Sequence, residues 1–508
     1  MDFTTFVLLL LILLLTFNLL SNSNFRRRRC RLPPGPYPLI AIGNFHQLGK
    51  NPHQSLAKLS KTYGPLMHLR LGSVDTIVVS SPEIAKEILL RHDGAFPERR
   101  IGAAARALRH HTKSLACLPV GAKWRSLRRI CQERMFSAQR LDSGRLLRQE
   151  KLRKLVDHGR DCCRKKLVMD VGTAAFVTAL NLISNTLFSM DFADYGSDSS
   201  QEFAESIRGL MRVLGKPNVA DFFTILRTFD LQGIKRESEF YVGKLLGIFD
   251  GIIDRRLEMR RNSERGEAMD DMLEALLQIN EEDQKNDEAD DHLSRDDIKH
   301  LLLDLFVAGT DTSSSTVEWT MTELLRNPNI MCKAKLEIQT IIGQEKRFIE
   351  ESDIPKLPYL QAIIKESFRY HPPGPFLVRT KGRDDHIEIK NYTIPKNALI
   401  FINIWAVGRD PIVWSNPNMF DPERFLHGKI IDVKGQNFEL IPFGAGRRIC
   451  PGMALAYRMI HLMVASLIHN FDWELEGGIE PEDVDISENF GLSLQKDLPL
   501  RAIPLHIR

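Results

Sequence analysis

The sequence predicts a mainly α-helical protein with small β-sheets, in which one large domain follows an N-terminal transmembrane helix. Apolar residues recur at helical spacing through most of the 508 residues. Strand-like segments are short and scattered, at 66–71, 76–79, 386–389 and 398–402. Hydrophobic residues make up 43% and charged residues 26% of the chain. This composition supports a large packed core and excludes a wholly disordered protein.

Residues 1–21 are predicted to form an uncleaved transmembrane signal anchor. Asp2 is the one charged residue in 1–20, and a spanning helix needs about 20 residues. The alternative, a cleaved signal peptide, requires basic residues before the apolar run, but here Arg26–Arg29 follows it. The positive-inside rule then places the main domain in the cytosol. We therefore expect a single-pass protein of the endoplasmic reticulum membrane, with membrane lipid as one partner.

Residues 22–36 are predicted to form a basic and proline-rich hinge, and residues 37–508 the main domain. Leu32-Pro33-Pro34-Gly35-Pro36 cannot continue a helix and keeps the chain extended, although an ordinary exposed loop fits the composition equally well. Residues 1–31 hold five arginines and one aspartate, so the whole formal charge of +4 lies there. A domain without net charge argues against a nucleic-acid-binding protein, which needs a basic face.

A long helix is predicted to begin at Ser294 and to end before Asn327-Pro328. Ser294 and Asp297 have the spacing of a helix N-cap, and apolar residues follow at a period of 3.6. The middle of this helix reads Ala308-Gly309-Thr310-Asp311-Thr312-Ser313, which lowers helix propensity. Such a break in an otherwise consistent element predicts a functional site.

The second candidate site surrounds Cys450. The chain has seven cysteines and no C-x-x-C pair, which disfavours a disulfide scaffold. Cys450 directly precedes a predicted helix at 453–471, whose amide N–H groups and dipole favour a thiolate. Gly446 permits close backbone approach, Arg448 can bind a carboxylate, and Phe443 can pack against a ring. Together these residues predict a proximal haem-iron site; the alternative is a buried structural cysteine.

The segment Phe443–Gly452 resembles the haem-binding signature F-x-x-G-x-R-x-C-x-G of the cytochrome P-450 haem-thiolate monooxygenases. The resemblance extends from Leu32 to Pro504 and is closest to the plant microsomal branch, of the geraniol 8-hydroxylase and ferruginol synthase type. It implies a haem b cofactor, with Cys450 as the metal ligand. One departure is Leu377-Val378-Arg379, where these relatives have a proline before the arginine.

Further motifs of the family occur in the expected order. The 308–313 segment matches the oxygen-activation motif, which implies that Thr312 and Asp311 are the catalytic residues. For Thr312 the alternative is a hydroxyl bonded to its own helix turn. The resemblance assigns haem propionate contacts and a structural network behind the cysteine to matching positions: Trp124, Arg128 and Arg379 for the contacts, and Glu366, Arg369 and Arg424 for the network.

The resemblance implies hydroxylation of an apolar small molecule, most simply a mono- or diterpenoid, with O2 as the oxidant. Because the sequence holds neither G-x-G-x-x-G nor a P-loop, electrons from NADPH are expected to arrive through a partner, NADPH-cytochrome P-450 reductase. The expected pocket residues are Phe306, Ala308, Phe376, Phe490 and Leu492.

Other functions remain open at this point. The same chemistry could act on an alkaloid, a phenolic or a xenobiotic. A haem isomerase or dehydratase would not need oxygen activation, and the intact Asp311-Thr312 pair opposes it. A non-enzymatic haem carrier or gas sensor is the remaining alternative.

Overall fold

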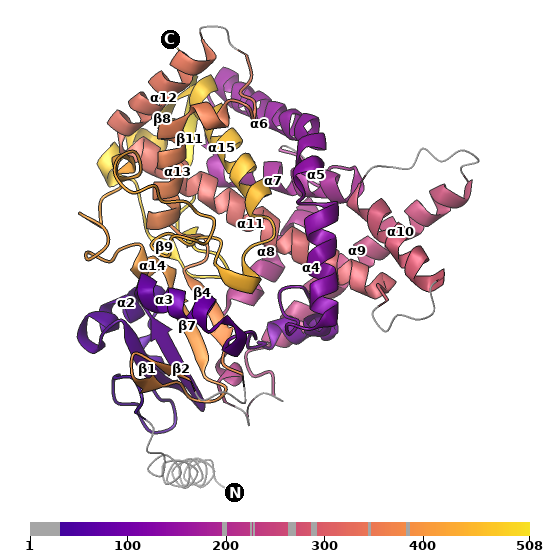
Figure 1. Ribbon diagram of the computed structural model, residues 1–508. Coiled ribbons are helices and arrows are strands. Elements are labelled where there is room, and N and C mark those ends of the chain that lie inside the picture. Colours follow the sequence, from indigo (N-terminus) through magenta and orange to yellow (C-terminus); the bar gives the residue numbers. More distant parts are fainter. Residues whose placement is uncertain are drawn as a thin grey trace, which may run out of the picture.

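The computed structural model describes residues 31–195, 201–223, 226, 229–262, 271–285, 292–343, 347–382 and 387–507. The predicted anchor at 1–21 and most of the predicted hinge at 22–36 lie outside these ranges. Within them the protein is mainly helical with small sheets, which confirms the predicted fold class (Figure 1).

Helices form most of the described chain, and two of them are central to the site. The helix predicted from Ser294 is α11 (Arg295–Arg326), and the helix predicted after Cys450 is α15 (Met453–Asn470). The others are α2 (Pro52–Tyr63), α3 (Pro82–Lys86), α4 (Ala122–Arg134), α5 (Ala138–Ser143), α6 (Arg145–Lys165), α7 (Val171–Phe188), α8 (Gln201–Gly215), α9 (Ile234–Asn262), α10 (Met272–Lys285), α12 (Pro328–Ile342), α13 (Pro358–Tyr370) and α14 (Ile404–Val407).

The largest sheet among the described residues has the strand order β1-β2-β7-β4 and lies at the lower left in Figure 1. Its strands are β1 (Leu66–Leu71), β2 (Val74–Val79), β7 (Leu399–Asn403) and β4 (Phe376–Thr380). A second sheet has the order β3-β11-β8, and two hairpin-like pairs complete the set: β3 (Met169–Asp170), β11 (Arg501–His506), β8 (Phe471–Leu475), β5 (Glu388–Ile389) with β6 (Tyr392–Thr393), and β9 (Glu488–Asn489) with β10 (Gln495–Lys496). The predicted strand at 66–71 coincides with β1.

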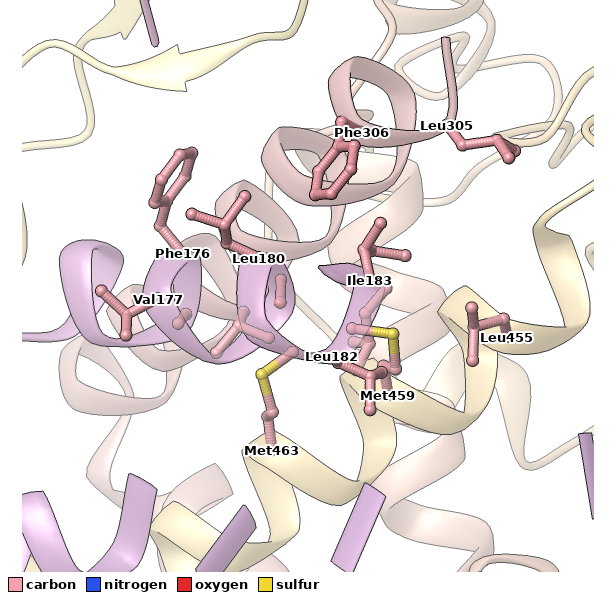
Figure 2. Close-up of a cluster of buried hydrophobic side chains, with 14 of the residues drawn as sticks. Phe176, Val177, Leu180, Leu182, Ile183, Leu305, Phe306, Leu455, Met459 and Met463 are labelled. Atoms are coloured by element: carbon pink, nitrogen blue, oxygen red, sulfur yellow. The ribbon is translucent and has the colours of Figure 1, made fainter. Parts of the chain in front are cut away.

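The helix α11 crosses the centre of the molecule and packs against α7 and α15 (Figure 1). Ser294 and Asp297 form the predicted capping box at its start. Figure 2 shows side chains of α7, α11 and α15 meeting in the apolar core. Gly309 permits a close approach here, because a Cβ at this position would lie 3.0 Å from Cδ1 of Ile183. The helix α7 is long and apolar enough to span a membrane, yet 78% of it is buried in this core.

The described end of the proline-rich segment lies along the edge of β1. The His68 N–H donates to the Pro34 carbonyl at 2.9 Å, and a side chain at Gly35 would collide with the His68 carbonyl. The prolines keep this segment extended beside β1, and Gly35 allows its backbone to approach His68 closely.

Candidate active site

The loop before α15 is held in one conformation by its own backbone. The Cys450 N–H donates to the Phe443 carbonyl at 2.9 Å, and Gly444 and Gly446 have φ values of +74° and +71°. A Cβ at Gly446 would collide with the Leu89 carbonyl. Both the positive φ and the lack of space require glycine at this position. The loop thus presents Cys450 at a fixed place.

The electrostatic surroundings of Cys450 only partly favour a thiolate. Burial raises the pKa of the thiol, while N–H groups of Gly452 and Met453 and the charge of Arg128 lower it. Arg128, on α4, also donates to the Ile449 carbonyl at 2.5 Å. A metal cation that accepts a sulfur lone pair would complete the stabilisation of the thiolate. Pro451 precedes the N-cap residue Gly452 and lies just before α15.

Four arginines gather beside this loop, namely Arg99, Arg128, Arg379 and Arg448. Arg448 donates to the carbonyls of Pro97 and Leu118, at 2.8 and 2.5 Å. Burial first, and then repulsion from Arg99, lowers the pKa of Arg448 to about 10 and that of Arg379 to about 9. Anionic carboxylates placed among these guanidinium groups would relieve the repulsion. This cluster of arginines therefore fits a ligand that carries carboxylate groups, such as the propionates of haem b.

The predicted contacts take part in this arginine group. Trp124 is buried on α4, and the guanidinium carbon of Arg448 lies 5.3 Å from the centre of its ring. Arg379 is buried on β4 even though the proline before it is missing. Sequence reasoning missed Arg99, which donates to the Ala116 carbonyl at 3.0 Å. No motif marks Arg99 in the sequence, because its neighbours in space come from distant segments.

Behind the loop, three charged side chains meet in the interior. The guanidinium of Arg369 makes two bonds of 2.7 Å to the carboxylate of Glu366, and both residues lie on α13. Arg424 donates to the same carboxylate at 3.1 Å. Arg369 also donates to the carbonyls of Pro417 and Met419, at 2.7 and 2.9 Å. The network therefore ties α13 to the 417–424 segment. Phe443 packs edge-on against Phe368 of the same helix, with 5.3 Å between ring centres.

Two residues in the middle of α11 are accessible. Ala308 is exposed and Thr312 half-buried, although most of this central helix is buried. The Thr312 hydroxyl donates to the Ala308 carbonyl at 2.8 Å, the bond within its own turn that the sequence left as an alternative. The oxygen of this hydroxyl still has lone pairs that can accept a hydrogen bond from a water or ligand molecule beside the helix.

Asp311 points to a different side of α11. Its Oδ1 accepts a hydrogen bond of 2.5 Å from Nε2 of Gln495, on β10. Its Oδ2 is buried and has no protein partner among the described residues. Burial raises the pKa of this carboxyl to about 6, while Gln495 and the charge of Arg208 oppose the rise. An acid with such a pKa can gain and lose a proton near neutral pH.

The five predicted pocket residues do not form one group. Ala308 is exposed on α11, whereas Phe306 is fully buried in the core (Figure 2). The Phe306 ring lies 5.7 Å from that of Phe249. Phe490 and Leu492 line a cavity beside Asp311. Phe376 is half-buried, with its ring 6.1 Å from that of Phe490.

Comparison with known proteins settles the family. The model of the Cytochrome P450 family matches residues 33–500. The chain belongs to the cytochrome P450 family. Its relatives include Cytochrome P450 76T24 of Catharanthus roseus, 52% identical over 94% of both chains. Ferruginol synthase of Isodon rubescens is 49% identical over 94% of this chain and 95% of its own. Cytochrome P450 76AD1 of Beta vulgaris is 47% identical over 99% of both chains.

Membership defines the chemistry in outline. A cytochrome P450 carries a haem-thiolate cofactor, and the protein is a monooxygenase that needs a substrate and a redox partner. The predicted family, enzyme class and cofactor are thus confirmed. A role as a haem carrier or as an isomerase does not agree with this class.

Proposed function

We propose that this P450 hydroxylates an apolar mono- or diterpenoid, with O2 and with electrons from NADPH delivered by NADPH-cytochrome P450 reductase. The substrate class rests on one observation. Relatives at 46–49% identity that cover 94% or more of this chain are named ferruginol synthase or sugiol synthase. Those names describe the relatives, and the experiment below tests whether this chain shares their substrates.

In this proposal Cys450 holds the haem iron through its sulfur. The glycine-fixed loop and the N–H groups of Gly452 and Met453 support that assignment. Arg99, Arg128, Arg379 and Arg448 hold the two propionates, since these guanidinium groups repel one another. Haem bound through a thiolate supplies the activation of O2 and the cleavage of its O–O bond.

Side chains of α11 order the water molecule and transfer the protons that the reaction needs. Thr312 accepts a hydrogen bond from a water molecule beside α11 and thereby orders it. Asp311 takes up a proton from solvent and releases it toward that water, a task for which its raised pKa is suited. Ala308 is exposed and apolar, so it can contact an apolar substrate.

Electron delivery is proposed to occur at the face that carries α4. Arg125, Arg129 and Arg134 are exposed on this helix, whose Arg128 contacts the cysteine loop. Lys123 belongs to the same basic cluster but bonds to Asp297 at 2.6 Å. A row of exposed positive charges beside the cofactor suits an acidic flavoprotein, because complementary charge steers association.

The proposed location is the endoplasmic reticulum membrane, with the P450 domain in the cytosol. Asn391-Tyr392-Thr393 is a glycosylation sequon, and Asn391 is exposed in the turn between β5 and β6. An exposed sequon would be glycosylated in the lumen and remains unmodified in the cytosol. A glycosidase-sensitive mass shift of the expressed protein would contradict the proposed topology.

The deciding experiment is a substrate screen with a plant reductase. Membranes that contain both proteins are incubated with NADPH and with geraniol, nerol, an abietane diterpene, and representative alkaloids and phenolics. The proposal expects an NADPH-dependent hydroxylated product from a terpenoid. Oxidation of an alkaloid or a phenolic, with none of the terpenoids converted, would overturn it. The Cys450→Ala variant, which lacks the proposed haem ligand, is the negative control.

A further inference from the structure

A cavity of about 510 Å³ lies on the side of α11 that carries Asp311. Its wall comes from the start of α7, from α8, from α11 and from the 489–499 segment. Ala308, Thr312 and Cys450 are not among the described residues that line it. The wall of this cavity therefore does not include the accessible part of α11 around Ala308.

The cavity leads from exposed to buried polar groups. Arg208 and Arg212 of α8 are exposed in its wall, and Arg208 lies over the ring of Phe176 at 4.2 Å. Asp311 is 5% exposed and is the buried acid of the wall. A cavity of this volume with charged and polar groups in its wall is large enough to hold several water molecules. Other charged groups in the wall are Lys216 directly after α8, Asp170 before α7, Glu318 of α11 and Lys496 of β10.

The 489–499 segment is fastened to α11 so that Gln495 meets Asp311. The Leu494 carbonyl accepts hydrogen bonds from Ser315 Oγ at 2.9 Å and from Trp319 Nε1 at 3.1 Å. Gln495 follows directly and donates to Oδ1 of Asp311. With Oδ1 occupied, the unpartnered Oδ2 is the oxygen left to bind a proton.

We propose that Gln495 is a positioning residue, which holds the Asp311 carboxyl so that Oδ2 can receive a proton from water in this cavity. The proposal rests on the monooxygenase reaction, in which O2, RH, two electrons and two protons give ROH and water. A proton passes from cavity water to Oδ2 and forms an O–H bond there. That bond breaks when the proton moves on to water on the Thr312 side, and the carboxylate is restored.

The test replaces Gln495 and measures how the electrons from NADPH are divided between hydroxylated product and hydrogen peroxide. With reductase and any substrate that the P450 oxidises, Gln495→Leu is expected to lower kcat about tenfold, as for a lost hydrogen bond to a charged group. The share of NADPH electrons recovered as hydrogen peroxide rises several-fold, the solvent deuterium isotope effect increases, and KM is unchanged. Because any substrate serves, a failure of the terpenoid assignment leaves this test intact.

Two further variants separate positioning from a structural role. Gln495→Glu is expected to recover coupling only at low pH, where its protonated carboxyl can donate to Asp311. In an Asp311→Asn background, Gln495→Leu should cause no further loss. The matched control is Gln278→Leu, since Gln278 donates to the Glu274 carboxylate at 3.3 Å away from the cavity. Unchanged peroxide yield and isotope effect in Gln495→Leu, or equal losses in both backgrounds, would overturn the proposal.

Discussion

Replacing Asp311 by asparagine should stabilise the folded P450 at neutral pH while it removes activity. Burial raises the pKa of this carboxyl from 3.8 to about 6. A shift of about two pKa units corresponds to about 3 kcal/mol, which the folded protein loses once the group is ionised. Asparagine keeps an acceptor for Gln495 and carries no charge. We therefore expect a gain of ~2–3 kcal/mol in the free energy of unfolding at pH 7.5.

The sign of the pH dependence follows from the raised pKa. Above pH 6 the buried carboxylate destabilises the folded state fully. As the pH falls through 6 the group takes up a proton in the folded protein, and the penalty shrinks until it vanishes below the unfolded value of 3.8. The advantage of Asp311→Asn should thus fall to roughly half its size by pH 5.

Urea unfolding of the haem-loaded protein between pH 5 and 8 measures this difference. Asp483→Asn is the matched control, because Asp483 is exposed on the surface and should show no such pH dependence. A variant that is no more stable than the wild type at pH 7.5, or a gain that does not change with pH, would refute the reasoning.

Three further substitutions test packing and the network. Glu366→Ala leaves two buried guanidinium groups without their partner, and it should destabilise the protein by ~3–5 kcal/mol and lower its haem content. Phe306→Ala should cost ~3–5 kcal/mol in unfolding experiments yet leave the product pattern unchanged, since the ring lies in the core; an altered regiochemistry would contradict this. Gly446→Ala should reduce the yield of haem-loaded protein, because its Cβ collides with the Leu89 carbonyl, whereas Gly247→Ala, with nothing within 4 Å, serves as its control.

Local patterns in the sequence predicted the elements well. The capping pair Ser294 and Asp297 fixed the start of α11, and β1 occupies the predicted residues 66–71. These features depend on neighbours in the chain, such as a side chain that bonds to an N–H group three residues on. The spacing of Glu366 and Arg369 likewise places both side chains on one face of α13.

Local sequence patterns could not predict contacts between segments that are distant in the chain. Gln495 meets Asp311 across 184 residues, and nothing in its local sequence indicates a carboxylate partner. The apolar spacing of α11 is compatible with Phe306 either in the core or in a substrate pocket. The packing of α7, α8 and α9 around its ring places it in the core. Helical spacing identifies an apolar face but not what covers it.

The central claim is that the sulfur of Cys450 holds the haem iron. The most direct measurement is the reduced carbon monoxide difference spectrum of purified protein, compared among the wild type, Cys450→Ala and Cys332→Ala, whose cysteine is free and exposed. The wild type and Cys332→Ala should both give the spectrum of thiolate-ligated haem, and Cys450→Ala should lose it. A wild-type spectrum of imidazole ligation, or a Cys450→Ala protein with an unchanged thiolate spectrum, would contradict the claim.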